Sequence, residues 1–332
     1  MGGILVHLVP SICIGFLLQL ILHETGHLVF GLLTGWEFIF LQIHRLIIKS
    51  VDKKLKLIFV RDKNYRCIMS PKSIDQDALL YTMGGCIINL ASAIAGFAMM
   101  AIVRTSPLLW LNIWSFSAFG AGLFFMNGTS RIYKVCNDKA CYNLLKEKPH
   151  TKLCHNAQLI IARYLAEGLT YSRIGKGLLC LCPKTAGNDI EAYQAVLEYY
   201  YYLDKRDYNG AGQALDKIKS TVRVSKEISD IVQTEQTYLK FILLLNHNNT
   251  SLNNIFPCNL KEFCKKGDIH SLRVSAAVNA YEELKAGHIN NALDILSKAK
   301  MMIDKANCVY EGEKIFCIRQ LEDMKKLITG KI

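Results

Sequence analysis

Two histidines and a glutamate lie close together near the start of the chain, in the stretch His23-Glu24-Thr25-Gly26-His27. If this stretch is helical, His23 and His27 project from one face a turn apart, because positions i and i+4 are neighbours on a helix. Two neutral imidazoles in that arrangement can hold a zinc ion. Glu24 would then lie beside the metal, where its carboxylate can take a proton from a zinc-activated water. The motif therefore predicts metal-assisted hydrolysis.

A pattern of five residues also arises by chance, so its surroundings decide how much weight it carries. The residues on both sides are apolar, and residues 2–36 contain no lysine or arginine and have Glu24 as their only acid. Ionisable side chains are costly in lipid, so one that is found there is first interpreted as part of a functional site. A structural histidine would account for one of the three side chains but hardly for all three. The surroundings therefore favour the metal site.

The chain is long enough for two domains, and its apolar residues are unevenly distributed. It has 332 residues, of which 51% are hydrophobic, and a net charge of +12. The hydrophobic residues concentrate before about residue 130, whereas the remainder has the composition of a soluble protein. The basic excess suits cytosolic segments beside anionic lipid. Because no basic helix with interleaved aromatic residues is present, we expect no nucleic-acid partner.

Three uncharged or nearly uncharged stretches are long enough to cross a membrane. They are residues 2–36, 78–103 and 105–130. As one helix the first would exceed ~50 Å, so we expect it either to protrude from the bilayer or to break near Pro10 or Gly15. It lacks the basic start of a signal peptide and continues into the histidine motif, so we expect it to be retained. The motif then lies in its second half, toward one membrane face.

The segment between the first two stretches, residues 37–77, has a different character. Residues 36–40 and 54–60 have strand-like composition and partial alternation, with a turn expected at residues 52–53. We therefore expect a small antiparallel sheet at the membrane surface. Basic residues outnumber acidic ones both here and in residues 131–152. Three spans place both segments on the same side, which is the cytosolic side by the positive-inside rule.

After about residue 150 the sequence is typical of soluble helices. Residues 203–211 and 284–292 share one spacing, with leucine, a large apolar residue and alanine at offsets 0, 5 and 8. This spacing resembles the corner between the helices of a tetratricopeptide repeat, although a generic helical hairpin bundle explains it equally well. We expect a mainly α protein. Residues 1–150 would form a polytopic membrane domain with about three transmembrane helices and a small surface β-sheet. Residues 151–332 would form a soluble α-helical, repeat-like domain.

With these parts placed, residues 1–150 resemble the site-2 protease family of intramembrane zinc metalloproteases. The resemblance rests on the histidine motif in the first span and on four further stretches in the family's order. These are Gly35-Trp36, Cys67-Ile68-Met69-Ser70-Pro71, Gly85-Cys86-Ile87-Ile88-Asn89 and Asn137-Asp138. Their order and spacing together are more specific than any one of them. One departure is Lys139, since the family usually has glycine after the aspartate.

The resemblance implies a role for each site residue. The zinc ligands would be His23, His27 and Asp138. Glu24 would be the general base, and Asn89 would help to bind the substrate backbone. A catalytic zinc does need three protein ligands and one open position. From the residues alone, however, Asp138 is more simply explained as an acid in a solvated loop.

The resemblance further implies a zinc metalloendopeptidase that hydrolyses a peptide bond of a membrane protein or peptide near the cytosolic membrane face. The alternative is a catalytically impaired membrane scaffold of the same fold, which binds partners through its C-terminal helices. The expected cofactor is Zn2+, and the expected partners are the substrate, the lipid bilayer and a protein bound by the C-terminal domain. We expect an integral protein of the bacterial cell membrane with a cytosolic C-terminal domain. The twelve cysteines, without a repeated C-x-x-C pair, fit a reducing compartment.

Overall fold

The computed structural model describes residues 2–51, 54–102, 106–130, 136–218, 224–247 and 268–330. The turn expected at residues 52–53 lies outside these ranges. The chain divides into two compact units, residues 1–160 and 161–332, slightly after the boundary suggested by the sequence. Both units are mainly helical, as expected.

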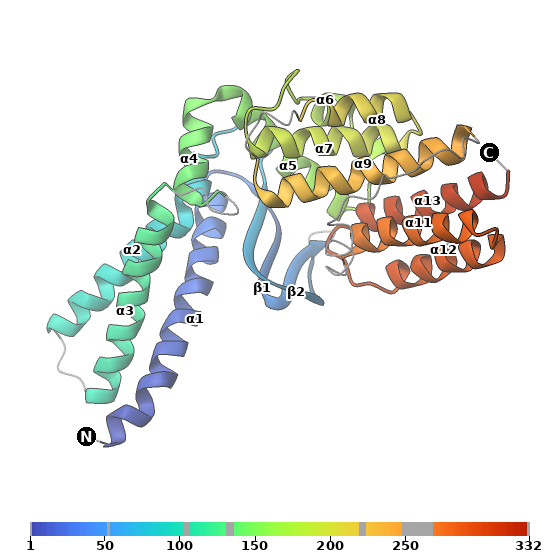
Figure 1. Ribbon diagram of the computed structural model, residues 1–332. Helices are drawn as coiled ribbons and strands as arrows, with labels where there is room; N and C mark the ends of the chain where they lie inside the picture. Colours follow the sequence, from blue (N-terminus) through green and yellow to red (C-terminus); the bar gives the residue numbers. More distant parts are fainter. Residues whose placement is uncertain are drawn as a thin grey trace. The chain divides into compact units, whose positions relative to one another are not determined.

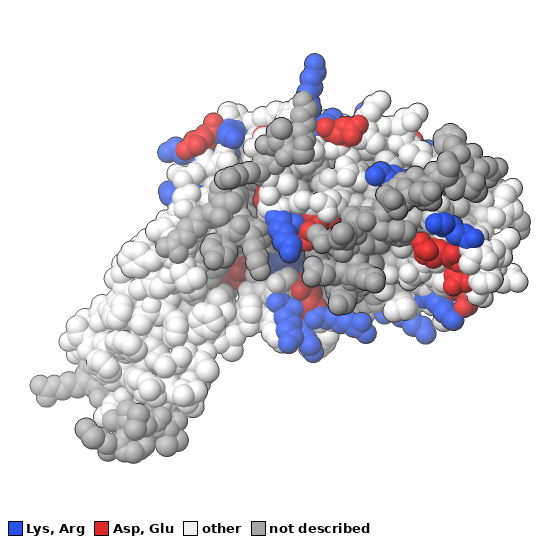
Figure 2. Space-filling model, viewed as in Figure 1, with Lys and Arg blue, Asp and Glu red and all other residues white. Residues whose placement is uncertain are grey.

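The first unit combines long helices with one β-hairpin (Figure 1). Its elements are α1 (Gly2–Leu33), β1 (Glu37–Val51), β2 (Lys54–Ser70), α2 (Leu79–Ile102), α3 (Pro107–Gly128) and α4 (Asp138–Glu147), and α5 (Pro149–Ala166) crosses the unit boundary. Among the described residues, three helices are long and apolar enough to cross a membrane, namely α2, α3 and α1 from His7 to Leu33. On the face shown in Figure 2, the lower left part, where these helices lie, shows no charged side chain among the described residues. The three predicted spans are therefore confirmed as membrane-length apolar helices.

Helix α1 runs without interruption through Pro10 and Gly15, so of the two alternatives expected from the sequence the unbroken helix is found, and it is longer than a bilayer core requires. Its end is set by Gly35, whose φ is +80°. This conformation, which glycine adopts at little cost, lets the Trp36 N–H donate to the Gly31 carbonyl at 2.9 Å. The helix thus stops shortly after the histidine motif, and the chain turns directly into β1.

Strands β1 and β2 pair antiparallel, as expected, with Glu37 opposite Ser70 at the end nearest to the helices. The strands extend far beyond the predicted residues 36–40 and 54–60. The register shifts twice along β1, and His44, next to the second shift, has a φ of +57°. Each shift sends the following side chains to the opposite face of the sheet. The alternation of apolar and polar residues is therefore interrupted along the strands, which is why their full length was not recognised from the sequence.

Glycines bring the three apolar helices into close contact. Where α1 crosses α2, a Cβ on Gly26 would lie 2.7 Å from the Gly84 carbonyl carbon, and a Cβ on Gly84 would lie 2.8 Å from that of Gly26. Where α1 meets α3, a Cβ on Gly15 would lie 2.9 Å from the Phe116 nitrogen. In lipid, helices associate through such close packing and not through the hydrophobic effect. The first crossing holds α2 directly against the histidine motif.

The second unit is a set of packed helices (Figure 1). Its elements are η1 (Tyr171–Arg173), α6 (Lys176–Leu179), α7 (Asp189–Asp204), α8 (Tyr208–Leu215), α9 (Lys226–His247), α11 (Ile269–Lys285), α12 (Ile289–Asp304) and α13 (Glu311–Ile328). Both stretches with the shared spacing lie where one helix ends and the next begins, between α7 and α8 and between α11 and α12. At the first, the Asp207 side chain caps α8 by accepting from the Gly210 N–H. At the second, Gly287 adopts a φ of +81°.

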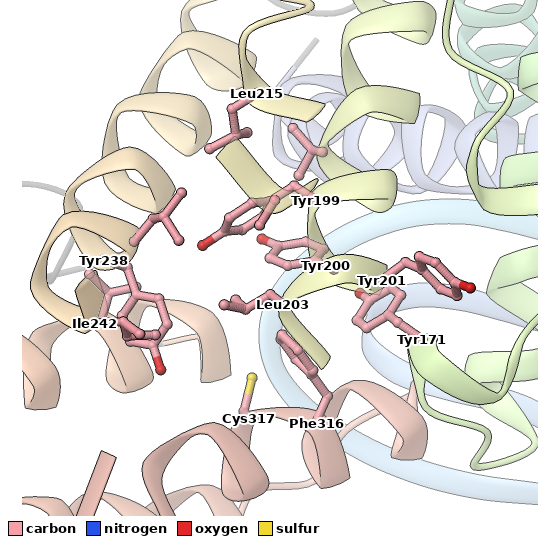
Figure 3. Packing of buried hydrophobic residues seen from close by; sticks show 14 of the residues in the cluster. Tyr171, Tyr199, Tyr200, Tyr201, Leu203, Leu215, Tyr238, Ile242, Phe316 and Cys317 are labelled. Carbon is pink, nitrogen blue, oxygen red and sulfur yellow. The ribbon is translucent and has the colours of Figure 1, made fainter. Parts of the chain in front are cut away.

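A buried ion pair lies within the aromatic core of this unit, part of which Figure 3 shows. Nη2 of Arg273 on α11 donates to both carboxylate oxygens of Glu235 on α9, at 2.5 and 2.7 Å. The hydroxyls of Tyr199 and Tyr200 on α7 donate to the same carboxylate, each at 3.0 Å. The guanidinium also lies 4.0 Å from the centre of the Tyr238 ring. The pair therefore joins three helices.

We expect Glu235→Ala to destabilise the second unit strongly. The arginine and glutamate side chains are 0% and 1% exposed, so the substitution leaves the Arg273 charge buried without its partner. Such a loss typically costs about 3–5 kcal/mol. The matched control is Asp294→Ala, which breaks an ion pair with Lys298 whose side chains are 57% and 71% exposed and should cost less than about 1 kcal/mol. Thermal unfolding followed by circular dichroism compares the two, and equal transitions would contradict the prediction.

Candidate metal centre

The side-chain atoms of the three predicted ligands converge on one point in the first unit. His23 Nε2 lies 3.4 Å from His27 Nε2 and 3.2 Å from Asp138 Oδ2, and His27 Nε2 lies 3.6 Å from the same oxygen. Three ligands held about 2.0–2.1 Å from a tetrahedral zinc ion lie about 3.3–3.4 Å from one another. Both the donor set and its spacing therefore fit a zinc ion.

Both imidazoles use their other nitrogen to bind an oxygen on α2. His27 Nδ1 lies 2.8 Å from the Tyr81 backbone carbonyl, and His23 Nδ1 lies 2.9 Å from Asn89 Oδ1. A carbonyl oxygen can only accept, so His27 Nδ1 carries the proton and its Nε2 keeps a lone pair for a metal. Oxygen acceptors of this kind orient the histidines of many metal sites.

Tyr81, whose backbone carbonyl binds His27, is itself held by two of the stretches noted in the sequence. These are Gly35-Trp36 and Cys67-Ile68-Met69-Ser70-Pro71. The Tyr81 hydroxyl donates to the Cys67 carbonyl at 2.9 Å. The Tyr81 ring stacks on the Trp36 ring with centroids 4.3 Å apart and planes at 24°. The hairpin therefore fixes the start of α2, whose backbone in turn orients His27.

Asp138 is the first residue of α4, beside the two histidines, and is not part of a solvated loop. Its side chain is 20% exposed. The preceding residue, Asn137, caps α4 by accepting from the Ala140 N–H at 3.0 Å. The Asn137 amide also donates to the carbonyls of Met126 and Thr129 at the end of α3, at 2.9 and 2.7 Å. Asn137 therefore joins α3 to α4 and places the carboxylate at the site.

Lys139, which follows Asp138, leaves the carboxylate in place. Lys139 Nζ lies 4.4 Å from the centre of the Tyr142 ring. The Asp138 carboxylate is directed at the two histidines, with Oδ2 3.2 Å from His23 Nε2 and 3.6 Å from His27 Nε2.

Glu24 is placed beside the ligands without being one of them. It is 9% exposed, and its carboxylate interacts electrostatically with both histidines and with the Cys67 backbone on β2. Burial, together with the charge of Glu24, raises the pKa of the Cys67 thiol to about 12, so this thiol remains protonated. A carboxylate in this position can accept a proton from a water molecule held near the two histidines.

Gly85 on α2 provides the space that His23 occupies. A Cβ at this position would lie 2.5–2.6 Å from three atoms of the imidazole ring. We therefore expect Gly85→Ala to displace His23 and weaken zinc binding by about 10-fold or more, as changes around a ligand do. The control is Gly122→Ala on α3, where a Cβ meets nothing within 4 Å. Zinc titration of both variants checks this, and equal affinities would contradict it.

Two residues of the site were not identified from the sequence. Tyr81 acts through its backbone carbonyl, which no residue type reveals. Gln19 is fully buried and donates to the Ser92 hydroxyl and the Phe116 carbonyl. It is a polar residue one helical turn before His23 in an otherwise apolar span, and this spacing could have indicated it.

The chain was compared with protein-family models, curated proteins and solved structures, and none of them gives a significant match. The resemblance to site-2 proteases therefore stays an expectation from the sequence. The interpretation of the site depends on the distances and partners described above.

Proposed function

We propose that this protein is an intramembrane zinc metalloprotease that cleaves a membrane protein or peptide near the cytosolic membrane face. The observation that supports this most strongly is the convergence of two imidazole nitrogens and one carboxylate oxygen at distances of 3.2–3.6 Å. A buried carboxylate, Glu24, lies beside them. This combination is the one required for metal-assisted hydrolysis of a peptide bond.

The proposal includes a location. The ligands from α1 lie in the second half of a membrane-length helix, toward the end where the basic hairpin begins. Following the positive-inside rule, we propose that this end is cytosolic and that the second unit lies in the cytosol of a bacterial cell. The second unit would recruit or regulate partners through its helix pairs, which we interpret as tetratricopeptide-like.

The protein's own residues would act in a fixed order. A zinc ion held by His23, His27 and Asp138 would polarise the scissile carbonyl and lower the pKa of a water molecule to about 7. Glu24 takes a proton from that water while the oxygen of the water forms a bond to the carbonyl carbon. Glu24 then gives the proton to the nitrogen as the carbon–nitrogen bond breaks. The products are a carboxylate and an amine.

The hairpin offers a way to present the substrate. A transmembrane helix hides its carbonyls in internal hydrogen bonds, so the cleaved segment must be extended. Strand β2 pairs with β1, and its Cys67 backbone reaches Glu24. An extended substrate that adds to this strand would receive backbone hydrogen bonds beside the general base.

The alternative, a scaffold without activity, needs no such site. It would gain nothing from three ligand atoms at zinc-like spacing or from acceptors at both histidine Nδ1 atoms. These features favour the enzyme.

The test is metal-dependent cleavage in a bilayer. The purified protein is reconstituted with synthetic single-span peptides that carry helix-breaking residues near one end, and products are identified by mass spectrometry. We expect cleavage to stop after treatment with a chelator and to return with zinc but not with calcium, whose ligands are oxygens. Zinc-loaded protein that cleaves none of these peptides would favour the scaffold, and cleavage that survives metal removal would exclude the mechanism.

A further inference from the structure

A chain of hydrogen bonds leads from α3, through Gln19 and Asn89, to His23. Gln19 and Asn89 are both 0% exposed and lie where α1, α2 and α3 meet. Buried amides in a membrane-length helix are costly unless every polar atom has a partner. Here each amide has partners on both of its ends, and those partners that can only accept, the backbone carbonyls, fix the orientation of each amide.

The first link is fixed by backbone carbonyls, which only accept. Gln19 Nε2 lies 3.0 Å from the Phe116 carbonyl and 3.1 Å from the Ser92 hydroxyl. The NH2 end of Gln19 must therefore face α3, and its oxygen must face Asn89. A Cβ on Gly120 would lie 2.7 Å from this nitrogen, so α3 leaves room for the amide and fixes its orientation.

The second link follows from the first. Asn89 Nδ2 donates to Gln19 Oε1 at 3.2 Å and to the Gln19 backbone carbonyl at 3.4 Å. Because Nδ2 is directed toward two acceptors, Oδ1 must face the other way, where it lies 2.9 Å from His23 Nδ1. An amide oxygen only accepts, so His23 Nδ1 carries a proton and its Nε2 is left for a metal.

We propose that Gln19 is a positioning residue of the metal centre, which sets the orientation of the Asn89 amide and through it the tautomer of His23. This inference rests on the proposed metal centre. The two ends of an asparagine amide have nearly the same size, so only hydrogen-bond partners decide between them. Without the Gln19 side chain, Asn89 Nδ2 keeps only the longer hydrogen bond to the backbone carbonyl of residue 19, at 3.4 Å. The Asn89 amide is then held less firmly and can turn its NH2 group toward His23 Nδ1. The imidazole then holds its proton on Nε2, where it blocks metal binding.

The variant that tests this is Gln19→Met, which keeps the length of the side chain and removes both ends of the amide. We expect its zinc affinity to fall by about 10-fold, the lower end of what changes around a metal ligand produce. The control is Ser117→Ala, since Ser117 is equally buried in the same bundle and, within the described part of the chain, its hydroxyl donates only to the Ile113 carbonyl of its own helix. Affinity is measured by chelator competition, and the visible spectrum of the cobalt-substituted protein reports ligand geometry.

A second substitution separates orientation from packing. An aspartate at position 89 has two oxygens and offers no donor when ionised, so it accepts from His23 Nδ1 whichever way it turns. We therefore expect Gln19→Met/Asn89→Asp to regain most of the affinity and the cobalt spectrum of the wild type. Asn89→Asp alone should bind more weakly than this double variant, because Gln19 Oε1 would then face a carboxylate oxygen.

The outcomes distinguish this inference from the proposed function. Wild-type affinity in Gln19→Met would overturn the role of Gln19 while leaving the metal centre intact. Weak binding in Gln19→Met that Asn89→Asp does not rescue would make Gln19 a packing residue only and would also overturn the inference. A wild-type protein that binds no zinc would overturn both.

Discussion

Glu24→Gln should leave zinc bound and reduce cleavage by about 10²–10⁴-fold, the typical contribution of a general base. The glutamine has nearly the same shape as the glutamate but has no carboxylate to accept a proton from water. Zinc should remain, because the ligand atoms belong to His23, His27 and Asp138. The measurement combines the cleavage rate in liposomes with the zinc content of the same preparation.

The control for this prediction is Thr25→Val, the next residue along the motif. The Thr25 hydroxyl donates to the Ile21 carbonyl of its own helix, at 2.8 Å, and to no other described residue, so its loss should change neither zinc content nor cleavage appreciably. Normal cleavage by Glu24→Gln would show that another group accepts the proton. Loss of zinc from Glu24→Gln would mean that Glu24 contributes to metal binding.

Asp138→Asn should lower the zinc affinity by at least about 10-fold, since removing a ligand should cost no less than changing a residue around it. The amide has no charge to offer the cation, and the two neutral imidazoles alone leave zinc with too few ligands. The fold should persist, because Asn137 and not Asp138 caps α4 and binds the end of α3.

Lys139→Ala is the matched control for Asp138→Asn. It removes the side chain next to the predicted ligand, and Lys139 Nζ lies over the Tyr142 ring. Its zinc affinity should equal that of the wild type. Titration of both variants in detergent against a competing chelator decides the matter. Wild-type affinity in Asp138→Asn would direct the search to other acids of the membrane-proximal segment.

The sequence was sufficient for the parts of the fold that depend on local composition. Uninterrupted apolar stretches predicted α1, α2 and α3, because a membrane-length helix needs only length and the absence of charge. The position of the histidines on one helical face followed from their spacing. The antiparallel hairpin was also predicted, although two register shifts hid the true length of its strands.

The remainder of the site depends on contacts between elements, which no local pattern specifies. The resemblance suggested that Asn89 binds substrate, and the structure places its oxygen against His23 Nδ1. From the sequence alone Asp138 was more simply explained as an acid in a solvated loop. In the structure it begins a short helix, α4. Its place beside His23 follows from the bonds between Asn137 and α3. Gln19 acquires its role only because α3 approaches α1 at Gly120.

The most direct test of this account is the metal content of the purified protein. Wild type prepared without chelators should carry about one zinc per chain, as expected for a site with three protein ligands. His23→Ala and His27→Ala should each lose most of it, while each variant keeps its helical circular dichroism. A wild-type protein without zinc, or histidine variants that retain it in full, would contradict the claim that His23, His27 and Asp138 form a zinc site.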